Sequence, residues 1–345
     1  MKKCLAFFLA VAMLVALAAS SQTAFADEAP HEYDVSNEEP VQILFACPNG
    51  ASNIETIYSE KWMEAVTERS EGKITFDYTN GGALGGYAEL LDGVEFGLYD
   101  MTITDLTYFQ AYVPETVVLS MPCLITSYEQ AKAVFNGEIG NWMWQKVADN
   151  TNMKVLNTYF CGFRYICSKD PLTNLADCKG YLIRSPQIDL YTDLLGLMGF
   201  SYVTMAWSEA YTAMSTGVIN AVEVPLQNIY EFGFYDLGKN VLCSRHLLSL
   251  NHVVANEAFW DSLPEVYQNI MLDAFNEMTA EEQAQCEANE NDYAAKLKEK
   301  GVTFYEFDEA GKQELIDAFK PYWTEKAAEF DAETQGLIDQ VIALG

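Results

Sequence analysis

The chain has 345 residues, and 50 acidic against 20 basic side chains give it a formal net charge of −30 at pH 7. A surface this acidic repels nucleic acids and anionic membranes, so those two classes of partner are excluded. The length exceeds one average domain, and we expect two lobes that together bury a large core.

The N-terminus has the parts of a secretory signal. Two lysines precede an apolar run over residues 5–19, and residues 24–26 read AFA, a small-residue cleavage site. The run is short for a membrane span and no stop-transfer charges follow it. We therefore expect a signal peptide over residues 1–26, cleaved near Ala26. Cys4 lies too early to carry a lipid, so we expect a free, secreted protein rather than a lipid-anchored one. Without the two signal lysines the net charge is −30 − 2 = −32.

Beyond an acidic leader over residues 27–40, for which we expect disorder, strands alternate with helices. This alternation predicts an α/β fold with parallel strand pairs. The predicted elements are strand 41–47, helix 53–70, strand 73–78, a helix carrying Leu90, Val94 and Leu98, strand 100–104, extended segment 154–168, strand 182–184, helix 189–198, helix 207–215, strand 221–223, a long helix from 264 to 300, strand 302–307 and a C-terminal helix. The long helix could brace two lobes, although a solvated acidic face would explain its charges equally well.

Two glycine and cysteine patterns carry less information. The glycine-rich run over residues 81–86 lacks the Lys-Ser/Thr ending of a phosphate-binding loop, so it predicts a turn before a helix. Seven cysteines remain after removal of the signal, and an odd number leaves at least one thiol free. Their spacings match no metal framework, and a disulfide between Cys167 and Cys178 is one open possibility.

Residues that could carry enzyme chemistry are scarce. No nucleophile–base pair or known catalytic motif is present, and we expect no cofactor. His31 lies in the leader, which leaves His246 and His252. Either these two contribute to a metal site with a nearby acid, or each has a structural role, which is the commoner case.

Two arginines lie within apolar segments, Arg164 in FCGFRYIC and Arg184 in GYLIRSP. A guanidinium in such a strand needs an anion or several acceptors, because burying it unpaired is costly. One interpretation is an internal salt bridge to Asp189, Glu209 or Glu223. The other is a two-point clamp on a ligand carboxylate.

Several ordered motifs resemble the DctP-type substrate-binding proteins of TRAP transporters. The run LADCKGYLIRSP over residues 175–186 resembles the family pattern "dlkGlkiRvP", and MAWSEAYTA over 205–213 resembles "mpfsEvYtAL". AVEVP over 221–225 stands where the family has "dGqEnP". Further matches, in register, are LMGF at 197–200, TGV at 216–218, ALGG at 83–86, LSMP at 119–122 and GFR at 162–164. Ordered motifs at fixed separations are far more specific than a single one.

The resemblance implies a two-lobed periplasmic binding protein fold of the α/β class, with a ligand cleft between the lobes and a long C-terminal bracing helix. The expected lobes are residues 41–161 with about 250–289, and residues 162–249 with about 290–345. Such a protein captures a small organic carboxylate and delivers it to membrane-embedded TRAP permease subunits. We expect it to act as a monomer, without turnover of the ligand.

The resemblance also implies which residues bind the ligand. In the family, the arginine matching Arg184 forms the main salt bridge to the carboxylate, and the one matching Arg164 assists. The full set of candidates is Arg184, Arg164, Trp207, Val224, Asn49, Tyr87, Glu209 and Tyr211. Glu209 and Tyr211 are expected to support the arginine rather than to touch the ligand.

Two positions depart from the family pattern. Sialic-acid-binding members have an asparagine where this chain has Val224, whose side chain can neither donate nor accept a hydrogen bond. Trp207 stands where phenylalanine is common, and either its ring stacks on a planar ligand or it packs in a hinge or core. These departures predict an aromatic, aliphatic or keto acid rather than a sialic acid.

Three other functions share parts of this pattern. A periplasmic enzyme on the same scaffold would need a nucleophile–base pair. A sensory module would bind the same class of acid and pass the signal to a kinase, and residues within the chain do not separate it from a transport protein. A solute-binding protein of an ATP-driven importer would share the shape but lack the pattern around Arg184.

Overall fold

The computed structural model describes residues 33–345, so the predicted signal peptide and the first part of the predicted leader lie outside the described residues. The strands are β1 (Val41–Ala46), β2 (Ile74–Thr79), β3 (Met101–Asp105), β4 (Met153–Ser168), β5 (Leu182–Ser185), β6 (Ser201–Thr204), β7 (Ala221–Pro225), β8 (Asn240–Cys243), β9 (Leu248–Asn256) and β10 (Thr303–Glu306).

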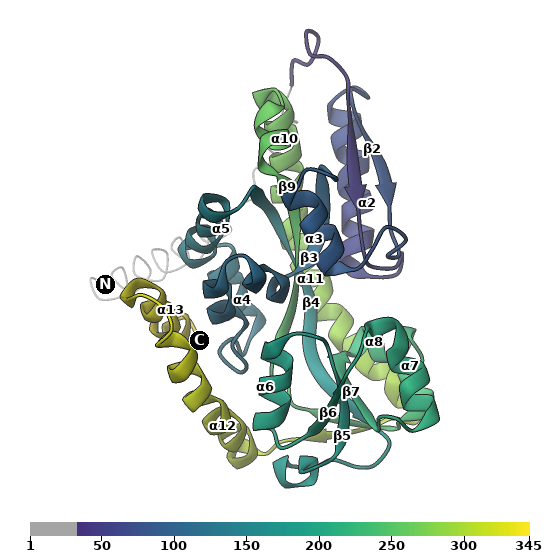
Figure 1. The fold of residues 1–345 in the computed structure, drawn as a ribbon. Helices are drawn as coiled ribbons and strands as arrows, with labels where there is room; N and C mark the ends of the chain where they lie inside the picture. Colours follow the sequence, from purple (N-terminus) through teal and green to yellow (C-terminus); the bar gives the residue numbers. More distant parts are fainter. Residues whose placement is uncertain (1–32) are drawn as a thin grey trace, which may run out of the picture. The chain divides into compact units, whose positions relative to one another are not determined.

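The helices alternate with these strands over most of the described chain (Figure 1). They are α2 (Ile54–Arg69), α3 (Tyr87–Glu95), α4 (Tyr128–Phe135), α5 (Glu138–Asn150), α6 (Asp189–Leu197), α7 (Trp207–Thr216), α8 (Leu226–Glu231), α9 (Phe234–Leu237), α10 (Glu257–Ser262), α11 (Glu265–Glu299), α12 (Glu309–Ala327) and α13 (Ala332–Ala343), with short 3-10 helices η1 (Leu106–Ala111), η2 (Pro114–Ser120) and η3 (Leu175–Cys178). Each strand and helix predicted from the sequence has a counterpart in the structure. Leu98, expected on the apolar stripe of α3, lies beyond the end of that helix and is exposed, and the expected C-terminal helix is divided into α12 and α13.

The strands form one mixed sheet in the order β2-β1-β3-β9-β4-β7-β5-β6, and β8 pairs with both β4 and β10. Parallel pairs, which the alternation of strands and helices predicts in general, are present: β1 with β2 and β3, β5 with β6 and β7, and β8 with β10. The pairs that join β9, β4, β7 and β8, as well as β3 with β9, are antiparallel. The antiparallel centre was not predicted, because neither β8 nor β9 was recognised as a strand.

Strand β4 belongs to both halves of the sheet. Residues 153–163 pair with β9, whereas residues 164–168 pair with β7. The exchange of partners follows a register shift between Phe160 and Gly162. Gly162 has a φ of 98°, a conformation that glycine adopts without the steric penalty of a side chain. The bulge therefore marks the point where one strand leaves the β9 half and enters the β7 half.

Helix α11 braces the two halves, as predicted. Along its 35 residues it packs against α2, β4 and α8 (Figure 1). Near its start, Phe275 stacks on Trp62 with ring centroids 4.2 Å apart. Near its other end, Tyr293 contacts Tyr230 of α8 at 5.7 Å. The helix contains neither glycine nor proline and is rich in Ala, Glu and Gln, so one uninterrupted element reaches both sets of strands.

The end of the predicted leader is held against the protein. Val35 is buried, and Lys73 Nζ donates to the backbone carbonyls of Ser36 at 3.0 Å and Glu38 at 2.7 Å. Tyr267 Oη donates to the carbonyl of Glu39 at 2.9 Å. The expected disorder therefore does not extend to residues 35–40, because a lysine and a tyrosine from distant elements satisfy their carbonyls.

The cysteines of the described chain are all free thiols. Cys167 Sγ lies 3.5 Å from the carbonyl of Gly238, and Cys178 Sγ lies 3.5 Å from that of Asn174. Cys167 and Cys178 are therefore not joined. None of the helices in residues 33–345 has both the length and the apolar composition that crossing a membrane requires.

Candidate functional site

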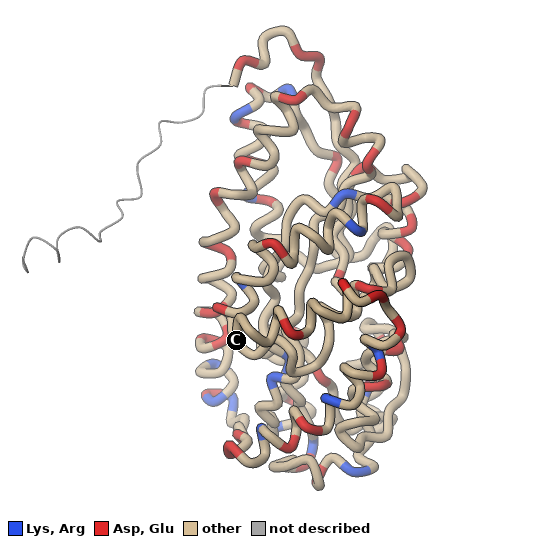
Figure 2. Tube along the Cα trace, turned by 90° about the vertical axis from the view of Figure 1, so that its left-hand side faces the viewer, with Lys and Arg blue, Asp and Glu red and all other residues tan. Residues whose placement is uncertain are grey.

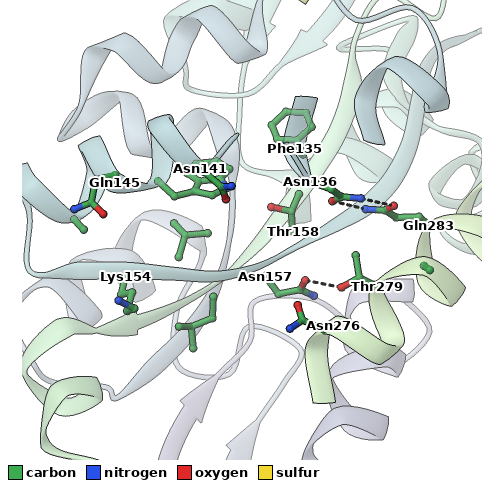
Figure 3. Close-up of a pocket in the computed structure, with 15 residues that line it drawn as sticks. Phe135, Asn136, Asn141, Gln145, Lys154, Asn157, Thr158, Asn276, Thr279 and Gln283 are labelled. Carbon is green, nitrogen blue, oxygen red and sulfur yellow. Dashed lines mark hydrogen bonds between the residues drawn. The ribbon is translucent and has the colours of Figure 1, made fainter. Parts of the chain in front are cut away.

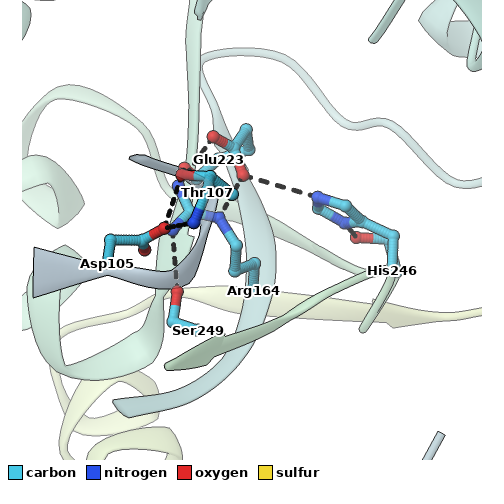
Figure 4. Close-up of polar contacts among 7 residues, drawn as sticks. Asp105, Thr107, Arg164, Glu223, His246 and Ser249 are labelled. Carbon is cyan, nitrogen blue, oxygen red and sulfur yellow. Dashed lines mark hydrogen bonds and ion pairs between the residues drawn. The ribbon is translucent and has the colours of Figure 1, made fainter. Parts of the chain in front are cut away.

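Arg164 is buried on β4 and is held by an internal partner (Figure 4). Its Nε donates to Glu223 Oε2 at 2.5 Å, and its Nη2 donates to Glu223 Oε1 at 2.7 Å and to the Glu223 carbonyl at 2.8 Å. Its Nη1 donates to Ser249 Oγ at 2.8 Å. The interpretation of an internal salt bridge is therefore right for Arg164, with Glu223 as the partner among the three acids considered.

Glu223 is fully buried on β7 and is shared between two basic groups. Burial by itself would raise the pKa of Glu223, but the charge of Arg164 and hydrogen bonds from Arg164 and His246 lower the pKa to about 2. His246 Nε2 lies 3.4 Å from Glu223 Oε2, and His246 Nδ1 lies 2.8 Å from Ser244 Oγ. The carboxylate is thus ionised at neutral pH and fixes the orientation of Arg164.

Arg184 lies on β5 with a different set of partners. Its Nε and Nη2 donate to the carbonyl of Met205 at 3.2 and 3.0 Å. Within residues 33–345 no carboxylate lies within 4.0 Å of its guanidinium, and its Nη1 has no hydrogen-bond partner. Burial lowers the pKa of Arg184 below its ordinary value; Glu223 opposes this effect, while the positive charge of Arg164 adds to it. Arg184 is a buried cation without an anion.

Trp207 lies beside Arg184, whereas Val224 alternates with Glu223 along β7 and so points to the opposite face of the sheet from Glu223 and Arg164. Trp207 begins α7, half-buried, and its ring centroid is 5.7 Å from Cζ of Arg184. The ring also contacts Phe232 at 5.0 Å and Phe234 at 5.3 Å. Val224 is buried on β7 opposite Tyr165 of β4. The indole therefore already packs against Arg184 and two aromatic rings.

Asn49 and Tyr87 form a second polar group. Tyr87 Oη donates to Asn49 Oδ1 at 2.6 Å, and Asn251 Nδ2 donates to Tyr87 Oη at 3.3 Å. The same Asn251 Nδ2 donates to Glu55 Oε1 at 3.0 Å. Asn49 Nδ2 and Asn251 Oδ1 are buried without a partner in the described chain. This group therefore keeps one free donor and one free acceptor.

Tyr108 of η1 connects the two groups and was not predicted. Its ring stacks on Tyr87 with centroids 5.2 Å apart. Burial and the charge of Asp105 raise the pKa of Tyr108 to about 12, while Arg184 and Arg164 act to lower it. Tyr108 therefore lies close enough to both arginines to sense their charges. Tyr108 lies in no sequence motif, so nothing in the sequence marked it as a residue near the arginines.

Two further residues around the arginines were missed. Tyr191 of α6 is buried, with its ring centroid 4.9 Å from Cζ of Arg164. Asp105 accepts from Thr107 N at 2.8 Å and from Thr107 Oγ1 at 2.5 Å, which caps η1. The position of Asp105 at the end of a predicted strand was the one available signal for it.

Glu209 and Tyr211 do not contact either arginine. Glu209 is exposed, and its Oε2 accepts from the backbone N–H of Ala206 at 3.1 Å, so it caps the start of α7. Tyr211 is exposed and packs edge-on against Phe234, with centroids 5.7 Å apart. Glu209 and Tyr211 therefore do not support the arginine as expected, because Glu209 caps α7 and Tyr211 packs against α9.

The two histidines are not partners in a metal site. His252 is buried beside Trp144, 4.6 Å between centroids, and burial lowers its pKa to about 3. Its Nδ1 lies 3.0 Å from Thr158 Oγ1, whereas His246 contacts Glu223. Residues 33–345 contain no group of three or more His, Cys, Asp and Glu side chains that could hold a metal ion.

Comparisons with known proteins agree with this arrangement. The family model for the bacterial extracellular solute-binding proteins, family 7 (DctP), matches residues 45–329. A solute-binding protein of Roseobacter denitrificans is 29% identical over 253 residues, which cover 73% of this chain and 78% of the relative.

Solved structures share the fold. A TRAP periplasmic solute-binding protein of Ochrobactrum anthropi, with its C-terminus bound in the ligand-binding pocket, is 26% identical with a TM-score of 0.82 over 88% of this chain and 95% of that one. A TRAP periplasmic solute-binding protein of Pseudomonas putida F1, with bound D-glucuronate, is 26% identical with a TM-score of 0.80 over 87% and 96%.

These matches confirm the predicted resemblance and the two-lobed α/β fold with its long bracing helix. The family consists of binding proteins rather than enzymes, which agrees with the scarcity of catalytic constellations. The chain belongs to the bacterial extracellular solute-binding proteins, family 7.

Proposed function

We propose that this protein captures a small organic carboxylate between its two lobes in the periplasm and delivers it to the permease subunits of a TRAP transporter. One observation carries the proposal: Arg184, 6% exposed, has no acidic partner in the described chain. A buried cation is costly unless an anion pairs with it. The carboxylate of a ligand would supply that anion.

The two arginines have different roles in this proposal. All three guanidinium nitrogens of Arg164 already donate hydrogen bonds to Glu223 or Ser249. Arg164 therefore shapes the site and contributes positive potential rather than binding the carboxylate directly. Arg184 keeps both hydrogens of Nη1 and one of Nη2 for a ligand. Two parallel donors on one guanidinium match the two oxygens of a carboxylate.

The neighbouring residues favour one class of acid. The ring of Trp207, which packs against Phe232 and Phe234, offers an apolar surface beside Arg184. We infer that a flat or moderately apolar acid binds more tightly than a polyhydroxylated one. The Pseudomonas putida relative holds D-glucuronate, so the affinity for sugar acids has to be compared with the affinity for flat or apolar acids.

A thermal-shift screen of the purified protein against a library of organic acids tests the proposal, because a ligand that binds only the folded state raises its apparent stability. The panel contains aromatic acids, aliphatic keto acids, C4-dicarboxylates, sugar acids and sialic acid. We expect the largest shift from an aromatic or keto acid. A largest shift from sialic acid would contradict the inferred ligand class, and no shift from any acid would contradict the function.

Transport rather than sensing is favoured by the relatives, since both solved structures above are described as TRAP proteins. Reconstituted TRAP permease subunits in proteoliposomes should accumulate the identified acid when this protein is added. Uptake that is independent of this protein would leave the binding assignment intact but remove the transport role.

A further inference from the structure

A groove with a volume of about 670 Å³ opens between α5, the first half of β4 and α11 (Figure 3). None of the eight candidate residues for the carboxylate lines it. Its walls are two helix stripes, each at positions i, i+3, i+4 and i+7, with β4 between them. The stripes consist of Asn141, Trp144, Gln145 and Ala148 on α5, and Asn276, Thr279, Ala280 and Gln283 on α11.

These stripes differ from ordinary helix contacts. Residues at this spacing on facing helices are usually apolar and close the gap between them. Here four of the eight positions are amides, one is a threonine, two are alanines and one is Trp144, so most of the positions that would fill the gap leave it open and polar. Strand β4 pairs with β9 on one edge over residues 153–163, and no strand pairs with its other edge before Arg164. The groove therefore lies between two polar stripes and beside a strand with an unpaired edge.

The lining side chains match a ligand rich in hydroxyl groups. Six of them are amides and two are threonines, and a single charged residue, Lys154, is present: Asn136, Asn141, Gln145, Asn157, Asn276, Gln283, Thr158, Thr279 and Lys154. No Asp, Glu or Arg lines the groove, although the chain has 50 acidic residues. Each amide both donates and accepts hydrogen bonds, as each hydroxyl of a sugar or polyol does.

Some of these groups hold the walls in place. Asn136 and Gln283 exchange two hydrogen bonds of 3.0 and 3.1 Å, and Thr279 Oγ1 donates to Asn157 Oδ1 at 3.1 Å (Figure 3). These contacts tie α11 to the end of α4 and to β4. They fix the spacing of the groove before any ligand arrives, which lowers the entropic cost of binding.

Other groups have no partner. The side-chain amides of Asn141 and Asn276, both at exposed positions of the groove, and Lys154 Nζ and Trp144 Nε1 form no hydrogen bond within residues 33–345. They come from all three walls of the groove. The indole of Trp144, half-buried among Phe109, Phe135 and His252, adds a rigid apolar face.

We propose that this groove is a second ligand site, for a small polyhydroxylated molecule of the monosaccharide or polyol class. Its volume falls within the roughly 300–1,000 Å³ of ordinary ligand pockets. The free amides bind hydroxyl groups, and the ring of Trp144 packs against the carbon skeleton. The site is independent of Arg184 and does not rest on the carboxylate function.

Fluorine NMR of protein labelled with 5-fluorotryptophan tests the proposal, because Trp144 reports on the groove and Trp207 on the arginines. Trp144→Phe and Trp207→Phe assign the two signals among the six tryptophans. The probes are D-glucose, D-galactose and D-mannitol. We expect at least one to shift the Trp144 signal saturably, with a millimolar dissociation constant, and to leave the Trp207 signal unchanged.

Three variants complete the test. Asn276→Leu should weaken binding about three- to tenfold, the effect of one lost hydrogen bond. Ala280→Phe should fill the groove and abolish the shift. Asn291→Leu, an exposed position on the same helix, should leave binding unchanged. Absence of any Trp144 shift, a linear shift without saturation, or a shift of Trp207 alone would overturn the second site.

Discussion

Arg164 and Arg184 are buried to nearly the same extent, at 8% and 6% exposure, but differ in the charge around them. Glu223 neutralises Arg164, whereas within residues 33–345 the guanidinium of Arg184 contacts the carbonyl of Met205 and the ring of Trp207 but no carboxylate. Because a buried charge must be compensated, the two residues respond differently to substitution in the ligand-free and ligand-bound protein.

Arg184→Lys should weaken carboxylate binding by about 1.5–3 kcal/mol, because lysine keeps the charge but loses the planar pair of donors. Isothermal titration calorimetry with the acid identified by screening measures this. Arg69→Lys on α2, an arginine paired with Glu277 on the surface, is the matched control and should bind as the wild type does. An affinity of Arg184→Lys equal to that of the wild type would refute the two-point clamp.

Arg164→Ala should lower the free energy of unfolding by about 3–5 kcal/mol, because it leaves Glu223 buried and unpaired. Arg184→Met should leave the ligand-free stability unchanged or raise it, since it removes a desolvated charge that has no partner. Urea unfolding of both variants without ligand compares them. Equal losses in the two variants would mean that Arg184 has a compensating partner in the folded protein.

At the scale of elements, α2 contributes a buried acid to the interior. Glu55 is 2% exposed in the first turn of α2, and burial raises its pKa from 4.5 to about 7, against hydrogen bonds from Cys161 and Asn251. Because the pKa of Glu55 is higher in the folded than in the unfolded protein, protonation of Glu55 favours the folded state at pH values below the unfolded pKa. That stability is lost as the pH rises through the folded pKa, here between about 4.5 and 7.

Glu55→Gln should therefore raise the free energy of unfolding relative to the wild type at about pH 8, by up to about 3 kcal/mol, and change little at about pH 4. Glutamine imitates the protonated acid at every pH. Urea unfolding at the two pH values measures the difference. Glu64→Gln, an exposed acid on the same helix, should show no such pH dependence; a benefit of Glu55→Gln that is the same at both pH values would contradict the shifted pKa.

Helix α11 is linked to the rest of the molecule through one carboxylate as well as through packing. Glu290 accepts from Tyr128 Oη and from Tyr165 Oη, each at 2.7 Å, and pairs with Arg245. Its three partners come from α4, from β4 and from the segment between β8 and β9. Glu290 therefore connects α11 to elements that are far apart in the sequence.

Glu290→Gln should lower the free energy of unfolding by about 1–3 kcal/mol, because three charge-assisted contacts lose their anion. Chemical denaturation followed by circular dichroism measures this. Glu287→Gln, one turn earlier on α11, removes only a surface pair with Lys132 and should cost less than about 1 kcal/mol. Losses of the same size in both variants would show that Glu290 acts as an ordinary surface charge.

At the scale of the whole molecule, the acidic surface opposes the approach of the proposed ligand. Figure 2 shows acidic residues distributed along the described chain, with few basic residues among them. Salt screens exposed charges over a Debye length of about 8–10 Å, but buried contacts such as those of Arg184 are screened much less. Ionic strength should therefore change the rate of approach more than the strength of the final contact.

The association rate of a carboxylate should rise modestly from low to physiological ionic strength, and its dissociation rate should change little. Stopped-flow tryptophan fluorescence follows both rates, with Trp207 as the reporter near Arg184. An uncharged ligand of the second site should show no salt dependence. A steep fall of the association rate with salt would mean that local attraction by the arginines outweighs the acidic surface.

Much of this protein could be read from its sequence. Alternating apolar segments, glycine turns and the ordered motifs around Arg164 and Arg184 predicted most of the described strands, the long helix α11 and the family, but not β6, β8 or β9. These signals are local, because hydrophobic period and turn chemistry are properties of short segments. The salt bridge of Arg164 was also among the expected alternatives, since a buried guanidinium restricts its partners to a few acids.

Only the tertiary structure decided which acid pairs with which base. Glu223 and Arg164 are far apart in the sequence, and their contact depends on the register of β4 against β7. Glu55 of α2 and Asn251 of β9 likewise meet, and Tyr108 of η1 stacks on Tyr87 of α3. No local pattern marks these residues. Glu209, which stands in a family motif, caps its own helix instead. Which charges pair depends on distances in space, because Coulomb energies and hydrogen bonds depend on geometry. Long-range strand pairing sets that geometry, and a short segment of sequence does not contain it.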